Sequence, residues 1–93
     1  MHNICHYVYD ENVDRNRVQK SLDEFVAMAD WQEGCKGLDK PIRWLDSKGV
    51  YPDENAALRA VDQFDRGWYD QLAVRFYGKN NAVKWLVKIE YHT

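Results

Sequence analysis

The sequence predicts an α+β domain built as a two-layer sandwich, in which a four-stranded mixed sheet carries two helices on one face in the order β-α-β-α-β-β. Two observations support this prediction. Two segments repeat apolar residues at the spacing of a helix, and two later segments alternate apolar with polar residues, as strands with one buried face do. With 93 residues the chain has room for one hydrophobic core. Residues 1–93 are therefore expected to form a single domain.

A first strand over residues 3–9 and a first helix are expected in the N-terminal third. Asp14 can cap the helix, and Val13 and Val18 occupy the two positions of a hydrophobic staple. The apolar residues of this helix recur at i, i+4, i+7, i+8 and i+11, and they are Val18, Leu22, Phe25, Val26 and Ala29. This stripe predicts a helix face that packs against the sheet.

The middle of the chain is predicted to hold a loop, a short strand over residues 42–45 and a second helix. Asp53 can cap this helix after Pro52, and Gly67 suits a left-handed cap at its end. The buried stripe of the second helix consists of Ala57, Val61 and Phe64.

The last third of the chain is predicted to form a hairpin around a turn at 78–81. Its first strand alternates at Leu72, Val74 and Phe76, and its second at Val83, Trp85, Val87, Ile89 and Tyr91. Strands buried on both sides read instead as continuous apolar runs, so the alternation places both helices on the same side of the sheet. With right-handed crossovers the first three strands run parallel and only the last is antiparallel. A ferredoxin-like plait is the alternative.

The uncovered face of this sheet is predicted to be basic and rich in tyrosine. It would carry Arg75 and Tyr77 from the third strand, and Lys84, Leu86, Lys88, Glu90 and His92 from the fourth. If Ile4 and Val8 point to the core, the face also gains Cys5, Tyr7 and Tyr9. Such a face can contact a protein, pair with a second copy of the chain or stack the bases of a single strand. The net charge of −2 and the lack of an aromatic RNA-recognition string favour a protein over a nucleic acid.

Aromatic residues make up 14% of the chain, and such residues dominate both protein cores and interface hot spots. Trp85 has the phase of a core residue. Trp31, Trp68 and Tyr69 follow the predicted helix ends, where they either anchor a partner or cover the edge of the core. The residues predicted to contact a partner are Trp31, Trp68, Tyr69, Arg75, Tyr77, Lys84 and Lys88.

Reactive side chains form no recognised catalytic or metal-binding pattern. His2, His6 and His92 would meet near Cys5 if the first and last strands are neighbours, but their spacing matches no known ligand motif. Cys35 lies beside a lysine, yet no histidine occurs in the middle of the sequence to act as its base. We therefore expect no catalytic residue, no metal and no cofactor, and we favour a non-enzymatic role.

The same features predict a cytosolic protein. No apolar stretch reaches the roughly 18 residues of a membrane span, and the first residues lack the pattern of a secretory signal. The two cysteines, Cys5 and Cys35, are too few for the disulfide framework of a small secreted domain. Both are expected to be free thiols.

Two segments resemble known sequences. Residues 30–35 (DWQEGC) and 65–74 (DRGWYDQLAV) are similar to segments of small proteins of Firmicutes and of their phages and mobile elements. The resemblance brings no activity, catalytic residue or cofactor with it. It implies a protein that binds a host macromolecule, and inhibitors of host defence nucleases are one such class.

The leading functional hypothesis is a protein-interaction domain that acts as an inhibitor or adaptor. One alternative is a small-molecule-binding or minor enzymatic domain with a pocket near Cys35. The other alternative is a single-stranded nucleic-acid binder. A homodimer is compatible with the first hypothesis.

Overall fold

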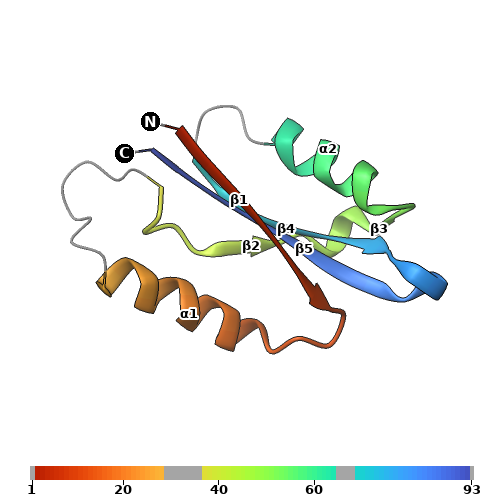
Figure 1. The fold of residues 1–93 in the computed structure, drawn as a ribbon, viewed down its shortest axis with the longest axis horizontal. Coiled ribbons are helices and arrows are strands. Elements are labelled where there is room, and N and C mark those ends of the chain that lie inside the picture. Colours follow the sequence, from red (N-terminus) through yellow and green to blue (C-terminus); the bar gives the residue numbers. More distant parts are fainter. Residues whose placement is uncertain (1, 29–36, 65–68, 93) are drawn as a thin grey trace.

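The computed structural model describes residues 2–28, 37–64 and 69–92, which form a five-stranded sheet between two α-helices (Figure 1). The helices are α1 (Arg15–Met28) and α2 (Glu54–Phe64). The strands are β1 (His2–Asp10), β2 (Ile42–Trp44), β3 (Val50–Tyr51), β4 (Gln71–Tyr77) and β5 (Val83–His92). The predicted α+β class, with a mixed sheet and two helices, is confirmed. Sequence analysis missed β3, because a strand of two residues has no readable alternation.

The strands lie in the order β1-β5-β4-β2, and β3 pairs with β4 further along the β2 edge. β1 and β4 both pair antiparallel with β5, whereas β2 and β3 pair parallel with β4. β5 is therefore the one described strand that runs against the others, as the crossovers predicted. The hairpin of β4 and β5 is confirmed, and the ferredoxin-like alternative is not formed.

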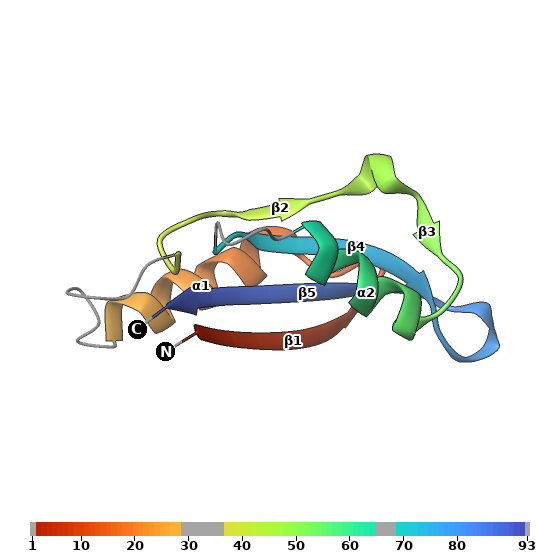
Figure 2. The same ribbon diagram turned by 90° about the horizontal axis from the view of Figure 1, so that it is seen from above.

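The two helices lie on opposite faces of the sheet, so the prediction that both cover one face is wrong (Figures 1 and 2). Figure 1 looks along the sheet from its β1 edge, with α2 above the strands and α1 below them. Val18 and Leu22 of α1 pack in one buried cluster with Trp85. Val61 of α2 packs in a second buried cluster with Leu86. The domain thus has three layers and two cores.

The path of the chain explains why the helices separate. The connection from β1 to β2 carries α1 from one edge of the sheet to the other, and the connection from β3 to β4 carries α2 back. Crossovers of the same hand that travel in opposite directions run over opposite faces. The strand pattern hid this, because β4 and β5 turn their apolar sides to different helices. Val74 pairs with Leu86 on the α2 side, and Ala73 pairs with Val87 on the α1 side.

Both helices begin at the predicted aspartate caps. Oδ1 of Asp14 accepts hydrogen bonds from the backbone N–H groups of Asn16 and Arg17 at 3.1 and 3.3 Å. Oδ1 of Asp53 accepts one from the N–H of Ala56 at 2.8 Å. These carboxylates satisfy donors that the first turn of a helix leaves unpaired. The predicted stripe residue Ala29 and cap residue Gly67 lie outside the described residues.

Trp85 is the centre of the core on the α1 side, as its phase predicted, and it is almost completely buried. Its indole Nε1–H donates a hydrogen bond to the backbone oxygen of Glu11 at 3.1 Å. Its ring meets that of Trp44 edge to face, with 5.0 Å between the centroids. The guanidinium groups of Arg15 and Arg75 stack on it at 4.8 and 5.5 Å.

Arg15 also ties α1 to the turn between β2 and β3. Its two terminal nitrogens donate to the carboxylate of Asp46 at 2.9 and 2.7 Å, which is the bidentate geometry that arginine favours. The guanidinium of Arg15 holds the pKa of Asp46 below its ordinary value. This ion pair thereby fixes the edge formed by β2 and β3 to the first residue of α1.

The three-layer arrangement exchanges the expected environments of Leu86 and Val8, which face each other across β5 and β1. Leu86→Ala should lower the free energy of unfolding by about 2–5 kcal/mol, because it leaves a cavity under α2. Val8→Ala, at a half-exposed position, should cost less than about 1 kcal/mol. Urea denaturation followed by tryptophan fluorescence measures both losses. A larger loss for Val8→Ala than for Leu86→Ala would contradict the placement of α2.

Candidate functional site

The two edges of the sheet differ in length and continuity. One edge is made by β2 and β3, which contain three and two residues and are separated by a 3-10 turn over Asp46–Lys48. The other edge is β1, an unbroken strand of nine residues. Proteins usually protect an edge with short strands, prolines, bulges or lysines, and β1 contains no proline, glycine or lysine. Among the described strands, β1 is the one suited to pair with another chain (Figure 1).

Apolar side chains of β1 are exposed on the α2 side of the sheet. Ile4 is 44% exposed and Val8 is 49% exposed, because α2 packs over β4 and β5 (Figure 2). The sequence allowed the case in which Ile4 and Val8 point into the core and the other side of the strand is open. They form instead an apolar strip along the edge, with His6 between them.

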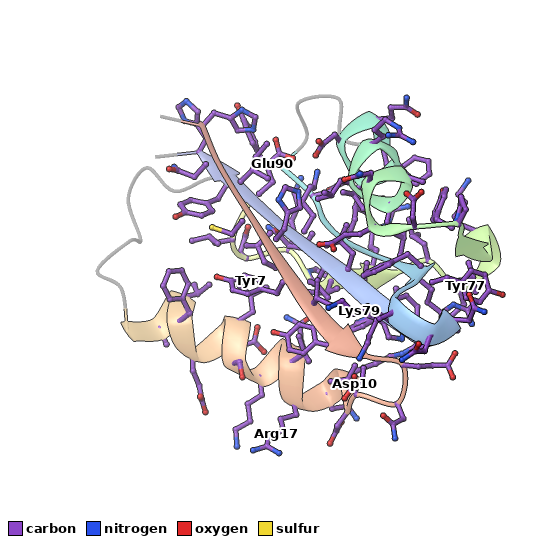
Figure 3. All side chains as sticks on the ribbon, turned by 45° about the vertical axis from the view of Figure 1, so that its right-hand side comes forward. Tyr7, Asp10, Arg17, Tyr77, Lys79 and Glu90 are labelled. Carbon is purple, nitrogen blue, oxygen red and sulfur yellow. The ribbon has the colours of Figure 1, made fainter. Side chains whose placement is uncertain are left out.

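On the α1 side, β1 borders a cavity of about 260 Å³ that lies between the strand and α1. Its lining includes Cys5, Tyr7, Tyr9, Leu22, Phe25 and Tyr91. Tyr7 of β1 is 50% exposed (Figure 3), and Phe25 of α1 is 45% exposed, so the rim of the cavity is open. Phe25 therefore lines this rim and does not belong to the buried stripe predicted for α1.

The polar groups of the cavity come mainly from β1. Partial burial raises the pKa of Tyr7 above its ordinary value, and the nearby Cys5 thiol acts in the same direction. Cys5 is a free thiol, as predicted. Because it packs on the α1 side, it lies on the face away from the three histidines of β1 and β5.

Two charged residues that were expected on an open face are buried beneath α2. Lys88 is fully buried, and its ammonium contacts Oε2 of Glu90 at 2.6 Å and the backbone oxygen of Val61 at 3.4 Å. The other carboxylate oxygen of Glu90 contacts Nε2 of His2. Lys88 is therefore not on the surface where the sequence placed it, because α2 covers this face and the ammonium neutralises a buried carboxylate.

The three histidines share the α2 side of the sheet. His2 and His92 face each other across β1 and β5, and the ring of Tyr69 packs against both at centroid distances of 5.6 Å. Nε2 of His6 lies 3.7 Å from Oδ1 of Asp62 on α2. Within the described ranges, no group of three histidine, cysteine or acidic side chains is arranged to hold a metal ion.

The basic and tyrosine-rich platform expected from the sequence is not formed. Arg75 and Tyr77 lie on the α1 side, whereas Lys84 lies on the α2 side and forms an ion pair with Asp10. Tyr77 is 43% exposed at the hairpin end, far from Tyr7 (Figure 3). The predicted residues Trp31, Trp68 and Cys35 lie outside the described residues.

Sequence analysis did not single out Ile4 and Val8 as surface residues. The signal that points to them is the composition of residues 2–10, which form strand over nine positions without a lysine, arginine or proline to guard an edge. That signal has meaning only for an edge strand. β5 lies between β1 and β4, and β4 is its partner in the hairpin. This order leaves β1 at the edge of the sheet.

Comparisons with protein-family models, with curated proteins and with solved structures give no match for this chain. No helix within the described ranges is long and apolar enough to cross a membrane. The geometry of β1 and of its two sides is thus the basis on which a function can be assigned.

The buried pair of Lys88 and Glu90 leads to a sharp expectation for stability. Lys88→Met removes the ammonium that contacts the buried carboxylate of Glu90 and should lower the free energy of unfolding by about 3–5 kcal/mol. The double variant Lys88→Met/Glu90→Gln also removes the charge of that carboxylate and should be more stable than Lys88→Met alone. Urea denaturation compares the two, and the opposite order of stability would show that the carboxylate does not depend on Lys88.

Proposed function

We propose that this chain is a protein-interaction domain that binds its partner by strand addition to β1. The observation that carries the proposal is an unbroken edge of nine residues on which Ile4, Tyr7 and Val8 are about half exposed. An edge strand offers a row of N–H and C=O groups, and a partner strand bonds to them while it covers the apolar side chains. Hydrogen bonding and apolar burial therefore favour the same bound state.

The side chains of β1 define the chemistry of the partner strand. Ile4 and Val8 favour aliphatic residues on the α2 side, and Tyr7 offers an aromatic ring on the α1 side. At the end of the strand, the carboxylate of Asp10 forms an ion pair with Lys84. Main-chain hydrogen bonds supply affinity in this binding mode, and the alternating side chains supply selectivity.

A role as an inhibitor or adaptor fits this mode of binding. The resemblance of the chain to small proteins of phages and mobile elements supports a host macromolecule, such as a defence nuclease, as the target in a cytosolic setting. A strand added to the sheet of a target can block or bridge a surface, and this needs no catalytic group.

Binding of a small molecule is the second candidate function, and the cavity between β1 and α1 favours it. Aromatic and aliphatic side chains line the cavity, with the Cys5 thiol, the Ser21 hydroxyl and the tyrosine hydroxyls as its few polar groups. Sites of this composition bind apolar and aromatic molecules. The pocket expected near Cys35 lies outside the described residues.

Substitution within the apolar strip tests the proposed protein interaction. Val8→Lys places a charge in the pairing edge and should weaken partner binding at least about tenfold, or by about 1.4 kcal/mol. Tyr77→Lys is the matched control, because Tyr77 is similarly exposed but lies at the end of β4. Affinity capture from the native host, with mass spectrometry of the recovered proteins, compares both variants with the wild-type chain.

Tyr77 belongs to the surface that the sequence predicted, so this control also tests that surface. Loss of the captured partner with Tyr77→Lys, together with retention by Val8→Lys, would favour the hairpin end and rule out β1 as the binding edge. Retention by both variants would exclude both surfaces.

Filling the cavity tests the second candidate. Ser21→Trp, on the cavity wall, should abolish binding of an apolar fluorescent dye, because the indole occupies the space that the dye needs. Ser47→Trp in the exposed 3-10 turn is the matched control and should bind the dye as the wild-type chain does. A fluorescence titration measures both. Equal dye binding by the two variants would place the dye elsewhere.

A further inference from the structure

We infer that the strand added to β1 is β1 of a second copy of this chain, paired antiparallel about a two-fold axis at His6. This inference rests on the proposed function, since it uses the same edge and names a second copy of the chain, in place of a host protein, as the source of the added strand. The occupant is argued from the order of residues along β1, which makes the strand complementary to itself.

Symmetry restricts how two copies of β1 can pair. A two-fold axis perpendicular to the sheet joins two edges into one continuous antiparallel sheet, and facing residues then lie on the same side of it. The axis must lie between the two copies of one residue, because only then do facing residues share a side of the sheet. An axis at His6, the midpoint of His2–Asp10, pairs all nine residues of each copy, and any other position leaves residues at the ends unpaired.

The central register matches the side chains on the α2 side. With the axis at His6, Ile4 faces Val8 of the second copy, and the symmetric pair repeats this contact. The two exposed aliphatic residues of each copy are then covered by each other. An axis at Cys5 would place Ile4 opposite His6, and an axis at Tyr7 would place Ile4 opposite Asp10. Neither shifted register pairs the two aliphatic residues.

The ends of the strand and its α1 side are also complementary in this register. Asp10 faces His2 of the second copy, so a carboxylate that accepts hydrogen bonds meets a ring that offers an N–H donor. Tyr7 faces Cys5 of the second copy, and its half-exposed ring covers that residue at the mouth of the cavity. The contact is thus continuous over both sides of the edge.

The size of the contact is suited to a stable pair. Nine paired residues exchange about eight to ten main-chain hydrogen bonds, which is the number found in a typical protein interface. The edge made by β2 and β3 consists of short strands and does not repeat this surface. Pairing through β1 uses the same patch on both copies, so the assembly closes at two.

The oligomeric state of the full chain gives the first test. Sedimentation velocity should show the wild-type chain at twice the mass of one copy at micromolar concentration. Val8→Lys should raise the dissociation constant at least about a hundredfold, because two ammonium groups then enter the interface next to Ile4 of the other copy. Tyr77→Lys should remain dimeric. A wild-type chain that stays monomeric up to millimolar concentration overturns the inference.

Disulfide trapping gives a second test that reads the register directly. Single-cysteine chains are made with Cys35→Ser, and with Cys5→Ser wherever position 5 is not the one examined. His6→Cys should cross-link two copies under mild oxidation, because facing Cα atoms about 4.5–5.5 Å apart suit a disulfide. Val8→Cys should not, because its two copies lie about 13 Å apart along the strands.

Cysteine at position 5 or 7 marks the two shifted registers. Cross-linking at either position, with none at position 6, overturns the axis at His6. If the wild-type chain is monomeric while Val8→Lys still loses its captured partner, the second copy is excluded and the proposed function stands. If Val8→Lys leaves both the dimer and partner capture unchanged, the dimer through β1 and the proposed function both fail.

Discussion

The rest of the structure depends on β5, which is hydrogen-bonded along both edges and covered on both faces. Trp85 and Val87 face the core under α1, whereas Leu86 and Lys88 face the layer under α2. Residues 85–90 of β5 are buried and turn no side to water, so the polar residues among them must be satisfied inside the protein. The ammonium of Lys88 and the carboxylate of Glu90 meet this requirement by pairing with each other.

Polar contacts fix the sheet around β5 at two further places. The amide of Gln71 donates to the backbone oxygens of Gly37 and Glu90 and accepts from the N–H of Glu90 at 2.7 Å, which joins β4, β5 and the chain before β2. Beside the middle of β4, between the stretches that pair with β2 and β3, Arg15 links α1 to Asp46. The edge formed by β2 and β3 is therefore held by side-chain contacts, although its strands contain only three and two residues.

β1 is held differently, and this difference gives the molecule its open surface. Its two ends are fixed to β5 by polar contacts, His2 with Glu90 and Asp10 with Lys84. Between these ends lies the apolar strip, and α2 packs over β4 and β5 rather than over it. A strand that is anchored at its ends and apolar in its middle is pre-ordered for pairing, so a partner does not have to order it on binding.

The sequence by itself determined the local features: the helix caps at Asp14 and Asp53, the hairpin of β4 and β5, and the core position of Trp85. Each depends on residues close together in the chain, where capping geometry and side-chain period act directly. Tertiary structure alone decided that the helices cover opposite faces, that Lys88 is buried and that β1 forms an edge. These follow from the order of the strands, and alternation along one strand cannot show which neighbour or helix each of its sides will meet.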